Sequence, residues 1–168
     1  MSALDALIWV VAAVLLAAGV SKLLAPEPAA RALRALVPAT AVGPGVARAL
    51  GAFEAAVGLA GLAIGGRATA VLLSLAYLGV TVTSVAAVRR GLPSCGCFGE
   101  RSARPTWLHV ALNLASLTIA LLGVASPPVG VGDGLRGHSA VGAFTTCALV
   151  TAAAVGVVAL ETTWSRGE

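Results

Sequence analysis

The chain has 168 residues, of which 58% are hydrophobic and only 11% are charged, and its mean hydropathy is +0.96. This composition excludes an ordinary soluble domain, and the low aromatic content of 4% leaves Ala, Val and Leu as the main apolar residues, which is typical of lipid-facing helices. The net charge of +4 reflects the distribution of Lys and Arg among loops, so it indicates membrane topology rather than nucleic-acid binding.

Five apolar segments are long enough, or nearly so, to cross about 30 Å of hydrocarbon at roughly 20 residues each. They are Leu4–Leu24, Val46–Ile64, Ala68–Val88, Trp107–Ala125 and Val141–Leu160. We expect the first to be a retained helix and not a signal peptide, because residues 1–5 contain no Lys or Arg and no clean cleavage site follows. The sequence therefore predicts an all-α integral membrane helical bundle.

The connections between these segments have distinct compositions. Residues 31–37 have the pattern of a short amphipathic helix at the membrane interface, and residues 65–67 predict a tight turn. Residues 126–137 are rich in Pro and Gly and predict a flexible linker. We therefore divide the chain into a four-helix membrane domain (1–125), this linker, and a fifth transmembrane helix with a short tail (138–168).

The distribution of basic residues predicts the orientation. With the N-terminus outside, the outer loops contain only Arg67 and Arg136. The inner loops and tail then contain Lys22, Arg31, Arg34, Arg48, Arg89, Arg90, Arg101, Arg104 and Arg166. The positive-inside rule therefore predicts that the loop with Cys95 and Cys97 faces the cytoplasm. We expect the protein to lie in the inner (plasma) membrane.

The second helix combines a small-residue face with a buried acid. Gly51, Gly58 and Gly61 predict close packing against a neighbouring helix. Glu54 lies about eight residues into this helix, roughly 12 Å below its starting surface. Ionisable residues inside membrane helices are candidates for function because burying them is costly.

Three further polar residues fall in the same half of the membrane as Glu54. Lys22 closes the first helix, His109 opens the fourth, and Asn113 lies one turn further along the same face. Up-and-down threading puts these positions and the cysteine loop on one side of the bundle. The cluster predicts a site for proton-coupled thiol chemistry.

Each member of this cluster also has a structural interpretation. Glu54 can pair with Lys22 or Arg48 and lock two helices together. Asn113 can link two helices by a hydrogen bond, His109 is close enough to the interface to be solvated, and Lys22 can be an interfacial anchor.

The cysteine loop, Cys95-Gly96-Cys97-Phe98-Gly99, predicts redox chemistry. A disulfide between cysteines separated by one residue closes a small, strained ring, which favours an exchanging bond over a structural one. Gly96 removes a side chain that would crowd this ring and tolerates unusual backbone angles. Nearby guanidinium groups are expected to stabilise a thiolate; they belong to Arg89, Arg90 and Arg101.

Two alternatives for the cysteine pair remain. Zinc needs four ligands, and only His109 and a carboxylate accompany the pair, so we expect no metal. A purely structural disulfide constrains little of the chain when its loop is this short. Cys147 lies in the fifth helix, nearer the opposite membrane face, and we expect inert packing for it.

Three stretches and one further residue of the chain share a pattern with one family: Ala18-Gly-Val-Ser-Lys22-Leu-Leu-Ala-Pro26, Gly51-Ala-Phe-Glu54-Ala-Ala-Val-Gly58-Leu, Gly91-Leu-Pro-Ser-Cys95-Gly-Cys97-Phe98-Gly99 and Asn113. With these residues the chain resembles the methylamine utilisation protein MauE family, within the DoxX-like redox-associated membrane proteins, from about Ala18 to Leu122. The resemblance implies a four-helix DoxX-like core, followed here by a fifth helix.

The resemblance also implies a function. It points to Cys95, Cys97 and Glu54 as catalytic positions of a thiol–disulfide oxidoreductase, supported by Lys22 and Asn113. The implied partners are a thioredoxin-like protein and a disulfide-containing client such as the small (beta) subunit of methylamine dehydrogenase. We expect no bound cofactor, with a membrane quinone as a candidate electron acceptor. The alternatives are a non-catalytic scaffold or chaperone for a redox enzyme and a small transporter that uses the Glu54 cluster.

Overall fold

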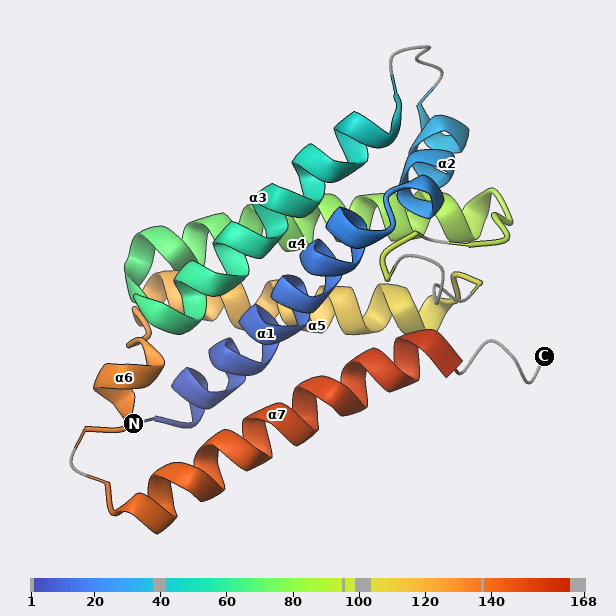
Figure 1. Cartoon of the computed structure of the whole chain (residues 1–168). Helices are drawn as coiled ribbons and strands as arrows, with labels where there is room; N and C mark the ends of the chain where they lie inside the picture. Colours follow the sequence, from blue (N-terminus) through green and yellow to red (C-terminus); the bar gives the residue numbers. More distant parts are fainter. Residues whose placement is uncertain (1, 38–41, 95, 99–103, 137, 164–168) are drawn as a thin grey trace.

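The computed structural model describes residues 2–37, 42–94, 96–98, 104–136 and 138–163. Among these residues every element is a helix (Figure 1), apart from an isolated bridge between Gly65 and Val129. The helices are α1 (Ala3–Leu24), α2 (Glu27–Leu36), α3 (Pro44–Ala63), α4 (Gly66–Arg89), α5 (Trp107–Ala125), α6 (Val131–Gly134) and α7 (Ala140–Thr163). Of these, α1, α3, α4, α5 and α7 are long and apolar enough to cross a membrane. The predicted all-α bundle of a multi-pass membrane protein is confirmed.

The helix bounds follow local capping chemistry. At the start of α1, the backbone N–H of Asp5 donates to Ser2 Oγ at 3.2 Å, and the N–H of Ser2 donates to Asp5 Oδ2 at 2.6 Å, which forms a capping box. Helix α3 begins at Pro44, a residue suited to the first helical turn. Helix α7 continues beyond its predicted end at Leu160, and this extension includes Glu161.

Helices α1 and α3 pack closely because glycines line their contact. A Cβ added at Gly58 would lie 2.6 Å from the carbonyl oxygen of Ala12, and one at Gly51 would lie 2.8 Å from the carbonyl oxygen of Gly19. Side chains at these positions would force the two backbones apart. The predicted small-residue face of α3 is therefore confirmed, and its partner is α1.

The apolar core lies where α1, α3, α4 and α5 meet. Ile8, Leu15 and Leu73 are almost completely buried there. Tyr77 of α4 reaches across this core, and its hydroxyl donates to the carbonyl oxygen of Val11 at 2.7 Å. The hydroxyl of a buried tyrosine needs such a partner, so this bond fixes α4 against α1.

Residues 126–136 form a packed connection and not the predicted flexible linker. The indole Nε1 of Trp9 donates to the carbonyl oxygen of Val129 at 2.9 Å, and the N–H of Val129 donates to Asp5 Oδ1 at 3.2 Å. The N–H of Gly66 donates to the carbonyl oxygen of Pro128 at 2.7 Å. The Pro and Gly residues thus produce tight turns held by hydrogen bonds at the N-terminal end of α1.

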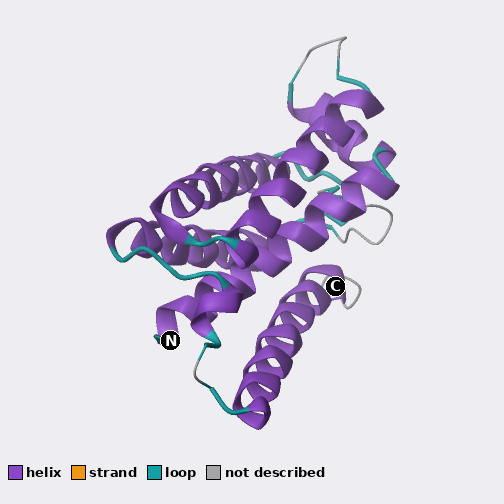
Figure 2. Cartoon of the chain, turned by 60° about the vertical axis from the view of Figure 1, so that its left-hand side comes forward, coloured by secondary structure: helices purple, strands orange, loops and turns teal. Residues whose placement is uncertain are grey.

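Helix α7 lies at the edge of the bundle, beside α1 (Figures 1 and 2). Its apolar side chains are largely exposed, as at Val141 and Phe144, whereas Ala154 and Glu161 are buried. A helix that exposes this much apolar surface is suited to contact with lipid or with another protein.

Candidate functional site

A buried ion pair between α1 and α3 forms the centre of the candidate site. Lys22 Nζ lies 2.6 Å from Glu54 Oε2, and the two side chains are only 6% and 3% exposed. The close approach of the helices at Gly51 places the two residues together, since a Cβ at Gly51 would lie 2.8 Å from Cβ of Lys22. Of the two predicted partners for Glu54, the structure has Lys22, while Arg48 is exposed.

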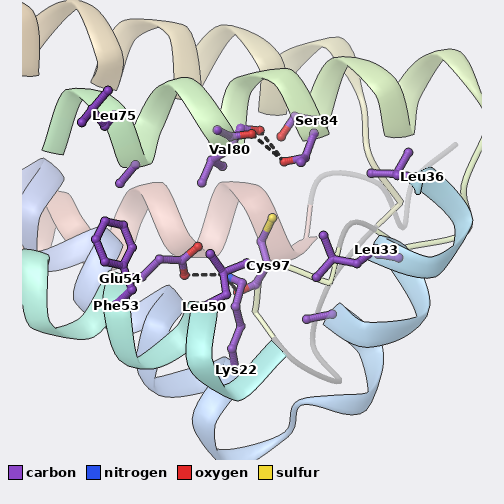
Figure 3. A pocket seen from close by; sticks show the side chains of 15 residues that line it. Lys22, Leu33, Leu36, Leu50, Phe53, Glu54, Leu75, Val80, Ser84 and Cys97 are labelled. Carbon is purple, nitrogen blue, oxygen red and sulfur yellow. Dashed lines mark hydrogen bonds and ion pairs between the residues drawn. The ribbon is translucent and has the colours of Figure 1, made fainter. Parts of the chain in front are cut away.

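The ion pair also contacts the cysteine loop. Lys22 Nζ donates to the carbonyl oxygen of Cys97 at 3.3 Å, which joins the end of α1 to the segment that follows α4 (Figure 3). Figure 3 shows the sulfur of Cys97 directed into the space between the Lys22–Glu54 pair and Ser84. Cys95 and Gly99, which the sequence analysis also assigned to the site, lie outside the described residues, as does Arg101.

Gly96 is held tightly against α2. Its φ is +70°, in the left-handed region that favours glycine, and an added Cβ would lie 2.6 Å from Cα of Ala29 and 2.8 Å from the carbonyl oxygen of Pro28. The N–H of Gly96 donates to Ser94 Oγ at 3.2 Å. A side chain at position 96 is therefore excluded both by backbone angle and by the contact with α2.

Phe98 and Arg90 make further contacts between this region and the helices around it. Phe98 is buried and packs with Val14, Ala18 and Ala154, so its ring contacts both α1 and α7. Arg90, at the end of α4, donates from Nη1 to the last carbonyl groups of α2, those of Ala35 and Leu36, at 2.6 and 3.0 Å. The short helix predicted at residues 31–37 is part of α2, whose first residues contact Gly96.

The two predicted residues of α5, Asn113 and His109, have different hydrogen-bond partners in the structure. Asn113 Nδ2 donates to Ser84 Oγ at 3.1 Å, so the amide links α5 to α4. His109 Nδ1 accepts a hydrogen bond from the backbone N–H of Thr106 at 3.2 Å. Its Nε2 therefore carries the hydrogen and donates to the carbonyl oxygen of Glu161 in α7 at 2.8 Å. The Asn113 bond is the interhelical link that its structural interpretation describes, whereas His109 is only 3% exposed and is bonded to α7 instead of being solvated at the interface.

Glu161 is a residue of the site that the sequence analysis missed. It is only 6% exposed, and together with Lys22, Cys97 and Asn113 it lines a small cavity of about 20 Å³. Ser84, 2% exposed and bonded to Asn113, was also missed. The sequence signal that could have identified Glu161 is its position as a single acid at the end of an apolar segment, on the side of the membrane where the other polar residues lie.

Cys147 does not belong to this site. It is exposed on α7 and lines a separate cavity of about 580 Å³, which lies between α1 and α7 and includes Trp9 and Ala154. Within the described ranges, His, Cys, Asp and Glu residues form no group of three or more that could hold a metal ion.

The fold and the site define a class: a multi-pass helical membrane protein in which a cysteine-bearing loop rests on a buried Lys–Glu pair. A protein-family model described as methylamine utilisation protein MauE matches residues 1–126. The chain therefore belongs to the MauE family, as its motifs predict, and the match ends where α5 ends, before α6 and α7. The comparisons with curated proteins and with solved structures gave no match.

Proposed function

We propose that this protein is a membrane thiol–disulfide exchanger that uses Cys95 and Cys97 to pass electrons between a thioredoxin-like partner and a second acceptor or donor. The observation that best supports this proposal is the attachment of the Cys97 carbonyl to the buried Lys22–Glu54 pair. An ion pair out of water is costly unless it is well bonded, and here it positions the backbone of the cysteine loop.

The exchange proceeds in two balanced steps. One thiolate of the pair attacks a sulfur of the partner disulfide, a mixed disulfide forms, and one partner thiolate leaves. The other cysteine then attacks the mixed disulfide, so that a Cys95–Cys97 disulfide forms and the second partner thiolate leaves. Two electrons have passed to the partner, and the two thiol protons are released, with Glu54 as the nearby carboxylate that accepts a proton. A partner dithiol drives the same steps in reverse.

The location and the client are parts of the same proposal. The protein lies in the inner membrane with its cysteine loop on the cytoplasmic side, because the basic residues concentrate there. The family name supports the maturation of methylamine dehydrogenase, through its disulfide-rich beta subunit, as the process served. Another disulfide-rich enzyme in this role would leave the chemistry of the loop unchanged.

Trapping the mixed disulfide tests the proposal. In cells that express the full chain with Cys95→Ser or Cys97→Ser, the remaining cysteine of the pair should retain a thioredoxin-like protein in a covalent adduct that a reductant releases. Cys147→Ser is the matched control and should give no adduct beyond that of the wild type.

The same variants separate exchange from the alternatives. A scaffold or chaperone would support client maturation without either cysteine, whereas an exchanger would not. A transporter would lose its transported flux when Glu54 is changed to Gln while thiol exchange continued. Client maturation at the wild-type level in the Cys95→Ser/Cys97→Ser double variant would contradict the proposal.

A further inference from the structure

A pocket of about 300 Å³ lies between α2, α3 and α4, next to the buried ion pair. Its walls are mostly apolar side chains, among them Leu33 of α2, Leu50 of α3 and Val80 of α4. Small-molecule sites in proteins begin at about this volume and share this pattern of an apolar wall with a few polar groups.

One end of the pocket has Lys22, Glu54 and Cys97, and Figure 3 shows the sulfur of Cys97 near the ion pair. Thr83 and Ser84 of α4 are further polar residues of the lining. An ammonium group has three donor hydrogens. Within the described part of the chain, that of Lys22 donates to Glu54 and to the Cys97 carbonyl, which leaves one donor for the oxygen of a ligand.

The other end of the pocket faces the region that lipid would occupy. Phe53 and Leu75 line it and are 44% and 57% exposed on the outer surfaces of α3 and α4. Figure 1 shows these two helices diverging from their turn at residues 65–66 toward α2. Because these lining residues of α3 and α4 are exposed, a ligand dissolved in the bilayer can reach the pocket from this side without crossing water.

The chemistry of the two ends selects one class of ligand. The ion pair is neutral overall, so it favours a neutral polar head over an anionic phosphate. Its free donor suits a carbonyl oxygen, and the adjacent sulfur suits a molecule that accepts electrons. The apolar entrance suits an isoprenoid or alkyl tail.

We propose that this pocket binds a lipid-soluble quinone, with the quinone carbonyl at Lys22 and the tail between α3 and α4. This inference rests on the proposed function and names its membrane acceptor. The two thiols of Cys95 and Cys97 give two electrons and two protons to the quinone, which becomes a quinol and leaves into the bilayer. A disulfide forms between the cysteines, and a partner dithiol reduces it again.

The test uses the reduced full-length protein in quinone-free nanodiscs, mixed without oxygen with a benzoquinone that carries a decyl tail. Quinol formation is followed by absorbance. Gly79→Leu is the blocking variant, because Gly79 lines the pocket and an added Cβ there meets no atom within 4 Å. Gly156→Leu is the matched control, since Gly156 is equally open but lies in α7, away from the pocket.

The wild type and Gly156→Leu should form quinol at similar rates, and Gly79→Leu should be slower by about tenfold or more, a change equal to about 1.4 kcal/mol. Gly156→Leu should exchange disulfides with a thioredoxin-like protein as well as the wild type does. Normal exchange without quinol formation by the wild type would overturn the quinone inference and leave the proposed function intact. Loss of exchange in the wild type would instead contradict the proposed function.

A second measurement does not depend on the folding of a variant. A photoreactive quinone analogue should label wild-type peptides that contain Phe53, Leu75 or Gly79, and excess decyl quinone should prevent this labelling. Labelling confined to the cavity beside Cys147 would overturn the assigned site, as would quinol formation by a folded Gly79→Leu variant at the wild-type rate.

Discussion

Replacement of the buried ion pair by apolar residues separates its structural role from its chemical one. Removing one partner leaves a buried charge without its counter-ion, which costs about 3–5 kcal/mol when the site is buried. Side-chain exposures of 6% and 3% for Lys22 and Glu54 place the pair in that range. We therefore expect Lys22→Met and Glu54→Met each to lower the free energy of unfolding by about this amount.

The double variant Lys22→Met/Glu54→Met should recover most of that loss, because two apolar side chains of similar volume replace a buried pair at little cost. The two single losses should then be non-additive by at least about 2 kcal/mol, within the range of coupling energies for residues in contact. Unfolding in mixed detergent micelles measures all four proteins and completes the double-mutant cycle.

The exchange rate of the same four proteins decides the role of the pair. The stable double variant should exchange disulfides with a thioredoxin-like protein at least about tenfold more slowly than the wild type, since it lacks the bond from Lys22 to the Cys97 carbonyl and the carboxylate of Glu54. A double variant that exchanged at the wild-type rate would refute this reasoning and leave the pair a purely structural link.

Three further predictions concern how the site is held. Gly96→Ala should slow exchange and destabilise the protein by about 1–3 kcal/mol. The control Gly91→Ala should cost less, because Gly91 also has a positive φ of +62° but no atom lies within 4 Å of the added Cβ. Thermal unfolding of the two variants measures the difference. Gly51→Ala should separate α1 from α3 and cost about 1–3 kcal/mol, whereas Gly45→Ala, in open space on the same helix, should leave the melting temperature nearly unchanged. His109→Phe removes the hydrogen bond to the Glu161 carbonyl of α7. Amide hydrogen exchange should therefore become faster at the C-terminal end of α7 but not in α1. Equal protection in the variant and the wild type would show that this bond does not hold α7.

The helical spans were predictable because length and hydropathy alone decide whether a segment can cross a membrane. The sequence also placed Lys22, Glu54 and Asn113 in one half of the bundle by threading alone. It left the partner of Glu54 open between Lys22 and Arg48, since both lie near that helix end. The choice depends on the close packing at Gly51, which brings the end of α1 to α3.

Other features depended on contacts that a linear pattern does not contain. The Pro and Gly composition of residues 126–136 is the same for a flexible linker and for tight turns, and hydrogen bonds to Trp9 and Asp5 decide between them. The predicted fifth helix ends at Leu160, before Glu161, and only the packing of α7 against the bundle buries this residue. The covering of Gly96 by α2 likewise required a three-dimensional contact between distant segments.

The most direct test of the account counts thiols in the purified full-length Cys147→Ala protein before and after oxidation by a thioredoxin-like disulfide. Alkylation followed by mass measurement should show two reactive thiols per reduced chain, both lost together on oxidation and both regained with the reduced partner. A folded protein whose Cys95 and Cys97 stay fully alkylatable in the presence of the oxidised partner would contradict the central claim that the loop exchanges disulfides.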